Sequence, residues 1–80
     1  MNDPYKEARS IADSLEANGQ RECAELLRSS MTDGSTGTEI YMILRWRLAN
    51  ITNDVDVATD VKARIRILHD YLDRELTSKN

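Results

Sequence analysis

Apolar residues recur at intervals of three and four along most of this chain, which is the spacing of one face of an α-helix. The stripe is clearest between about Asp56 and Leu76, where it consists of Val57, Val61, Ile65, Leu68, Leu72 and Leu76. Another stripe lies between Pro4 and Ala17 and consists of Tyr5, Ala8, Ile11, Ala12 and Leu15. No alternation of apolar and polar residues persists anywhere, so the pattern predicts helices and no strand.

Turn-forming residues predict where the first two helices begin and end. Asp3 suits an N-cap, Pro4 a first helical position, and Gly19 the left-handed residue that follows a helix. A second helix, from about Gln20 to Ser30, has an apolar side made of Cys23, Ala24, Leu26, Leu27 and Met31. Because the link is so short, the two helices either form an antiparallel hairpin or continue as one kinked helix.

The third predicted helix, Ile40 to about Ile51, follows the turn-rich stretch Gly34–Glu39. Thr36 and Glu39 have the spacing of a capping box, which marks a helix start. Around the helix axis, the main apolar arc consists of Ile40, Ile43, Leu44, Leu48 and Ile51. A smaller group almost opposite consists of Met42, Trp46 and Ala49. This helix is therefore either central and covered on both sides, or it has one buried and one exposed apolar face.

These elements predict a single domain over residues 1–80. The expected fold is all-α, an antiparallel bundle of four helices, or of three if the first two are continuous. A chain of this length is marginally stable alone, so binding to a partner or to a second copy is a reasonable expectation.

Composition narrows the classes of function. The net charge is −3, from 14 acidic and 11 basic residues, and this mildly acidic balance counts against nucleic acid as the main target. The stretch from Met1 has no basic region followed by an apolar run, so we expect no signal peptide. No apolar run approaches the roughly 18–20 residues that cross a bilayer, so no membrane partner is expected. With a single cysteine, Cys23, the chain fits a cytoplasmic location.

The residues that carry chemistry do not form a recognisable catalytic or metal-binding set. Gly34–Glu39 lacks the lysine and the preceding strand of a phosphate loop, so turn formation and capping explain it. His69 is the sole histidine and we interpret it as a boundary residue beside Asp73, while Cys23 is expected to be a buried, inert thiol. The acidic cluster Asp54, Asp56 and Asp60 suits the start of a helix. We therefore expect no enzyme, no metal and no cofactor.

Arg47 lies inside the main apolar arc of the third helix, where a buried guanidinium needs a partner. Glu16, Glu22 or Asp60 could supply it, or the side chain could extend to water along its aliphatic stem.

The best candidate for a functional surface is a side patch of residue types that anchor protein interfaces. It consists of Met42, Arg45, Trp46, Arg64, Ile67 and Tyr71. The patch would remain uncovered if both main stripes face one core. The alternative is that Met42 and Trp46 pack under the first helical hairpin.

Residues 12–46 resemble small bacterial helical proteins of uncharacterised function, which are similar to immunity proteins, the class that neutralises a toxin by binding it. The resemblance rests on the hairpin pattern of Ala12, Leu15, Gly19, Ala24 and Leu27, followed by the stretch from Gly34 to Trp46. It implies a bacterial cytoplasmic origin and a binding role.

The function expected from the sequence is therefore that of a non-enzymatic protein-binding module. The specific hypothesis is an immunity or antitoxin-like inhibitor that occludes a partner protein. A structural homodimer or adaptor, in which the patch buries itself across a two-fold axis, is the alternative. A small nucleic-acid-binding regulator ranks third.

Overall fold

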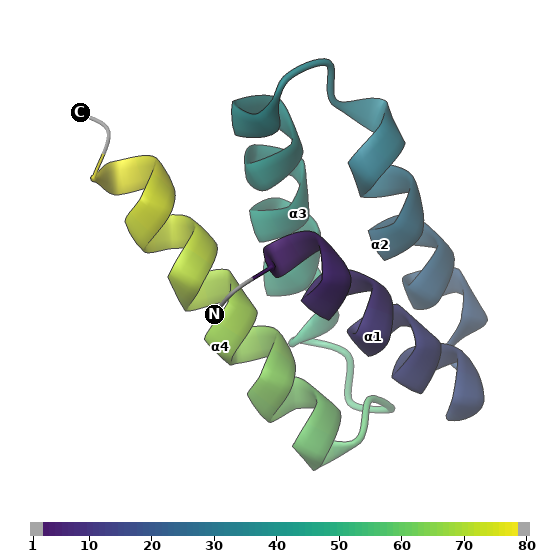
Figure 1. Ribbon diagram of the computed structural model, residues 1–80. Coiled ribbons are helices and arrows are strands. Elements are labelled where there is room, and N and C mark those ends of the chain that lie inside the picture. The colour runs from purple at the N-terminus through teal and green to yellow at the C-terminus, as the bar shows by residue number, and fades with distance from the viewer. Residues whose placement is uncertain (1–2, 79–80) are drawn as a thin grey trace.

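The computed structural model describes residues 3–78, which form four helices and no strand (Figure 1). The helices are α1 (Pro4–Ala17), α2 (Arg21–Asp33), α3 (Gly37–Ile51) and α4 (Thr59–Thr77). The all-α bundle of four helices is thereby confirmed. Residues 1, 2, 79 and 80 lie outside the described residues, and so does the beginning of the stretch considered for a signal peptide.

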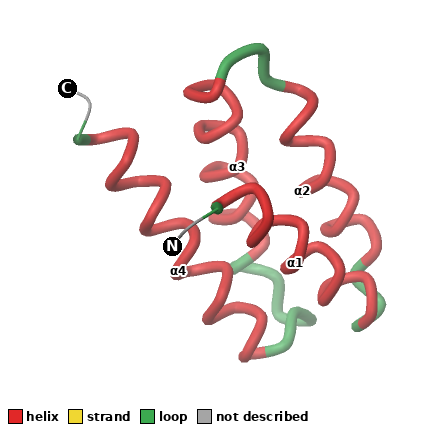
Figure 2. The backbone as a smooth tube through the Cα atoms, in the orientation of Figure 1, coloured by secondary structure: helices red, strands yellow, loops and turns green. Residues whose placement is uncertain are grey.

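Each helix packs against the next one in the chain, and α1 also packs against α4, so the four form a closed ring. Figures 1 and 2 show the α2–α3 link at one end of the bundle, with the α1–α2 turn and the α3–α4 link together at the other. Helices α1 and α2 form an antiparallel hairpin, so the alternative of one continuous kinked helix is wrong.

Predicted caps hold the starts of α1 and α3. Asp3 Oδ1 accepts hydrogen bonds from the backbone N–H groups of Tyr5 (3.0 Å) and Lys6 (3.2 Å). Thr36 Oγ1 accepts from the Glu39 N–H at 3.1 Å, and the Glu39 carboxylate lies 3.3 Å from the same hydroxyl. Each cap satisfies backbone donors that have no partner within their own helix.

The α1–α2 turn is a Schellman motif, as the glycine position predicts. Gly19 has φ +85°, its N–H donates to Glu16 O (3.1 Å), and Gln20 N–H donates to Leu15 O (2.8 Å). These two bonds satisfy carbonyls at the end of α1 and reverse the chain within three residues. The turn therefore sets the pairing of α1 with α2.

Three element boundaries differ from the sequence-based prediction. Helix α3 begins at Gly37 instead of Ile40, directly after its Thr36 cap. Helix α2 continues past Ser30 to Asp33. Helix α4 begins at Thr59 instead of near Asp56, because the segment before it forms a turn. There the Asp54 carboxylate accepts from the Asp56 N–H (2.9 Å), which competes with helix formation.

The core contains most of the predicted apolar stripes. Its buried members are Ala8, Ile11, Ala12, Leu15, Ala24, Leu27, Leu44, Leu48, Ile51, Val57, Val61, Ile65, Leu68 and Leu72. Every helix contributes to it, so the hydrophobic effect holds the ring together as one unit. The outer face of α3 does not take part: Trp46 is 68% exposed and Met42 is 51% exposed. The alternative that Met42 and Trp46 pack under the first helical hairpin is wrong.

Candidate functional site

One arginine bridges each of the four seams of the ring. Arg28 links α2 to α1, Arg47 links α3 to α2, Arg45 links α3 to α4, and Arg64 links α4 to α1. Arg28 is the most heavily paired, since its guanidinium contacts Asp13 at 2.7 Å, Glu16 at 2.5 Å and Glu25 at 3.5 Å. Its hydrogen bonds to Asp13 and Glu16 raise the pKa of Arg28 above its ordinary value.

Arg47 finds its partners on α2 and not among the acidic residues that the sequence suggested. Its guanidinium donates to Leu26 O (2.8 Å) and to the hydroxyls of Ser29 and Ser30 (3.0 Å each), and it pairs with Asp33 at 3.1 Å. Pairing with Glu16, Glu22 or Asp60 is thus wrong. The cause is the unpredicted last turn of α2, which brings Asp33 beside α3.

Beside Arg47, the seam between α2 and α3 opens into a groove of about 310 Å³. We call this the α2–α3 groove; its lining consists of Cys23, Leu26, Trp46, Arg47, Asn50, Ile51 and Asp54. Leu26 on one wall is 47% exposed and Trp46 on the other is 68% exposed. Two large apolar side chains therefore stand at the edges of an unfilled, mostly apolar hollow, the kind of surface that marks an interaction site.

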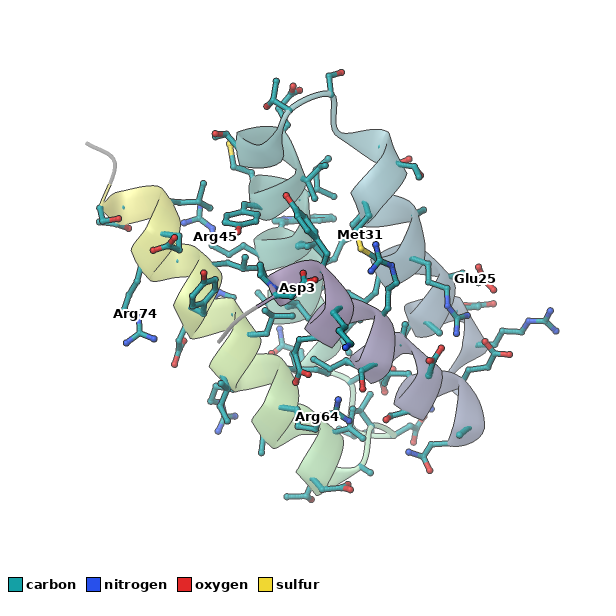
Figure 3. All side chains as sticks on the ribbon, in the orientation of Figure 1. Asp3, Glu25, Met31, Arg45, Arg64 and Arg74 are labelled. Carbon is teal, nitrogen blue, oxygen red and sulfur yellow. The ribbon has the colours of Figure 1, made fainter. Side chains whose placement is uncertain are left out.

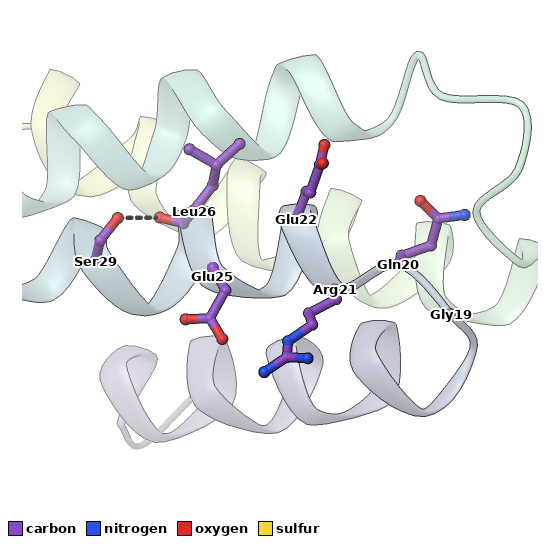
Figure 4. Close-up of a pocket in the computed structure, with 7 residues that line it drawn as sticks. All are labelled: Gly19, Gln20, Arg21, Glu22, Glu25, Leu26 and Ser29. Atoms are coloured by element: carbon purple, nitrogen blue, oxygen red, sulfur yellow. Dashed lines mark hydrogen bonds between the residues drawn. The ribbon is translucent and has the colours of Figure 1, made fainter.

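The outer face of α2 continues this surface as a shallow, more polar hollow (Figure 4). Figure 4 shows Glu22 and Leu26 pointing toward α3, while Arg21 and Glu25 point toward α1. Leu26 is shared by this hollow and the α2–α3 groove. The α3 side of α2 thus presents a carboxylate and, one helical turn on, an exposed leucine.

Cys23 lies in the wall of the α2–α3 groove and is partly buried. Burial raises the pKa of its thiol, and the nearby carboxylates of Asp54 and Glu22 raise it further. At neutral pH the group is therefore a protonated, weakly nucleophilic thiol. His69 lies on α4, diagonally across the ring, where it contacts Asp70 at 3.2 Å. Asp73, the expected neighbour of His69, is bonded to Arg45.

The six residues of the predicted side patch do not lie together. Met42 and Trp46 project from the outer face of α3, and Arg45 turns toward α4, where it bonds Asp73 at 2.8 Å. Arg64 turns the other way, toward α1 (Figure 3), and donates to Ser10 Oγ (2.8 Å) and Ser14 Oγ (3.0 Å).

The remaining two members lie on the α1 flank of α4. Tyr71 is two turns along from Arg64, and it packs against the core with Tyr5 and Tyr41. The pKa of the Tyr41 phenol is raised by burial and by the neighbouring Tyr71 and Tyr5. Ile67 is 62% exposed on the same flank. The structure thus separates Met42 and Trp46 from Ile67 and Tyr71.

Sequence reasoning missed the α2 wall of the groove. It assigned Leu26 to the core side of its helix together with Leu27, although consecutive residues point about 100° apart. That angular difference is the signal that could have found it, because only one of the two leucines can face the centre of the bundle.

Two further features bear on the chemistry of this surface. Within residues 3–78, no group of three acidic, histidine or cysteine side chains could hold a metal ion. Among the helices described, none is both long and apolar enough to pass through a membrane.

Comparison with protein-family models, with curated proteins and with solved structures finds no match to this chain.

Proposed function

We propose that this protein is a non-enzymatic protein-binding module whose contact surface is the α2–α3 groove with the adjoining outer face of α3. The observation that carries the proposal is the 68% exposure of Trp46, flanked by Leu26 (47%) and Met42 (51%). Tryptophan is strongly enriched among the residues that dominate binding energies, and a folded chain gains no stability from leaving it in water. A partner that covers it supplies that burial.

Within this role, the narrower proposal is an inhibitor of the immunity or antitoxin type, acting by occlusion in the bacterial cytoplasm. Its support is the resemblance of residues 12–46 to such proteins and the net charge of −3, which speeds encounter with a basic target. Occlusion requires no cofactor and no catalytic group on this chain.

The test is a comparison of the wild-type chain with Trp46→Ala and Ile67→Ala as immobilised baits in a lysate of the source organism. Ile67 is the matched control because it is similarly exposed (62%) but lies on α4. A protein retained by wild type is then purified and its Kd measured by calorimetry. We expect Trp46→Ala to cost about 2 kcal/mol of binding, near thirtyfold in Kd, and Ile67→Ala to change Kd less than about twofold.

Thermal melting followed by circular dichroism shows whether both variants are folded, so that unfolding is excluded as the cause of lost binding. Equal losses of binding energy in the two variants would mean that Trp46 and Ile67 belong to one contact surface, as the sequence predicted. Light scattering across a wide concentration range tests the alternative, a homodimer. A dimer whose Trp46 emission shifts to the blue as it forms would mean that the surface binds its own copy.

A further inference from the structure

The α2–α3 groove has a defined charge pattern as well as an apolar lining. Asp54 lines the groove at its end nearest the α3–α4 link. Glu22 lies in the adjoining hollow on α2, one turn before Leu26, and points toward α3 (Figure 4). Among residues 3–78 neither carboxylate has an ion-pair partner, whereas Asp13, Glu16, Asp33 and Asp73 are each paired with an arginine. Asp54 uses one carboxylate oxygen in its turn, Oδ1, which accepts from the Asp56 N–H.

The one positive group in the lining is already neutralised. Arg47 is only 19% exposed, and its guanidinium is bound to Asp33, to Leu26 O and to two serine hydroxyls. It therefore offers little to an acidic ligand. Both carboxylates also raise the pKa of the Cys23 thiol. The negative charge of Asp54 and Glu22 therefore acts on the Cys23 wall of the groove.

The shape favours a helix as occupant. The groove lies between two antiparallel helices, and its edges are large apolar side chains, which is the arrangement that receives the apolar face of a third helix. We propose that the α2–α3 groove binds an amphipathic helix of a partner protein, with a large apolar residue seated between Leu26 and Trp46 and a lysine or arginine placed against Asp54 and Glu22. This inference rests on the proposed protein-binding function and specifies the chemistry of its partner.

The probe is a pair of synthetic helical peptides of about 15 residues, long enough to form a helix when bound. Both carry the same leucine stripe and no aromatic residue; one is flanked by lysines and the other by glutamates. Trp46 is the only tryptophan, so its emission reports directly on the groove. At low salt we expect the lysine peptide to shift this emission to the blue and to bind at least about tenfold more tightly than the glutamate peptide.

A charge-matched pair of double variants distinguishes the groove from the net charge of the protein. Glu22→Gln with Asp54→Asn removes the carboxylate in the groove and the one beside it, and the asparagine keeps the oxygen that accepts from Asp56 N–H. Glu39→Gln with Asp70→Asn removes the same two charges elsewhere, and glutamine still suits the capping box. We expect the first double variant to bind the lysine peptide about fivefold or more less tightly than wild type, and the second to lose less than about twofold in affinity.

Equal losses in both double variants would overturn the inference, because net charge alone would then explain the affinity. Equal affinity for the two peptides would overturn it too, while leaving the protein-binding proposal to the Trp46→Ala bait experiment. A lysine peptide that binds without moving the Trp46 emission contradicts the assigned site. A dimer with blue-shifted emission before any peptide is added means that a second copy is the occupant, which also overturns the inference.

Discussion

Helix α2 packs against α1 on one side and α3 on the other, and the two seams are built differently. Toward α1, Arg28 bonds carboxylates of both helices, and the alanines Ala8, Ala12 and Ala24 are completely buried. Toward α3, Arg47 closes only the part of the seam near the α2–α3 link. Beyond it, Leu26 and Trp46 stand half in water around an open groove.

The difference shows how one helix supports both folding and recognition. Small buried residues let two helices approach closely, so little apolar surface is left over at their seam. Bulky side chains at the margin of a seam keep its edges apart, and their surface remains available to a third body. In the α2–α3 seam, the polar contacts of Arg47 join the helices at one end, and the apolar end is left free to bind.

The largest effect should come from truncating adjacent leucines on α2. Leu27→Ala removes a fully buried side chain and should cost about 2–5 kcal/mol of unfolding free energy. Leu26→Ala removes a half-exposed one and should cost less than about 1 kcal/mol. Urea denaturation measures both. Similar losses would mean that the groove wall is part of the core and the two seams are not distinct.

The second-largest effect should come from removing the polar contacts that Arg47 makes across the α2–α3 seam. Arg47→Ala removes the donor to the buried Ser30, the partly buried Ser29 and the exposed Asp33 carboxylate, and we expect a loss of about 1–3 kcal/mol. Arg28→Ala is the comparison: its ion pairs are open to water, so its midpoint in urea should fall less. A larger fall in the urea midpoint for Arg28→Ala would contradict the expectation that Arg47 contributes more to stability than Arg28.

The turn that joins α1 to α2 can be tested at one position. Gly19 adopts φ +85°, which is strained for any residue with a Cβ, so Gly19→Ala should cost about 1 kcal/mol although the added methyl meets open space. Gly37→Ala at the start of α3 is the control, because its Cβ would make an ordinary 3.7 Å contact with Tyr5 Oη. Thermal melts in which both variants match wild type would argue against the Schellman turn.

The smallest expected effect concerns the thiol in the groove. Because burial raises the pKa of Cys23 above its ordinary 9.0, alkylation by iodoacetamide at pH 8 should be slower in the native protein than in urea. The thiol form is the one favoured by folding. Its contribution to stability is therefore complete below pH 9.0 and is lost as the pH rises through the raised pKa. Equal rates with and without urea would show that the thiol is open to water.

Patterns along the chain were sufficient for the helices and not for the surface. The caps at Asp3 and Thr36, the glycine turn and the stripe of α4 follow from local chemistry, and these parts of the prediction are confirmed. The partner of Arg47 depended on where α2 ends, and the separation of Ile67 from Trp46 depended on how α4 is rotated in the ring. Both are set by how the helices pack against one another, and the apolar stripe of a single helix does not predict that packing.

The closed ring described above also bears on the speed and order of folding. Three of its seams join helices that follow each other in the chain, so most of the packing is between near neighbours in sequence. Chains of that kind fold within about microseconds to milliseconds. The α1–α4 seam alone must bring the two ends of the chain together, at the largest cost in loop-closure entropy. It is therefore expected to form last, with the hydrogen bonds of Arg64 to α1 as the step that completes the molecule.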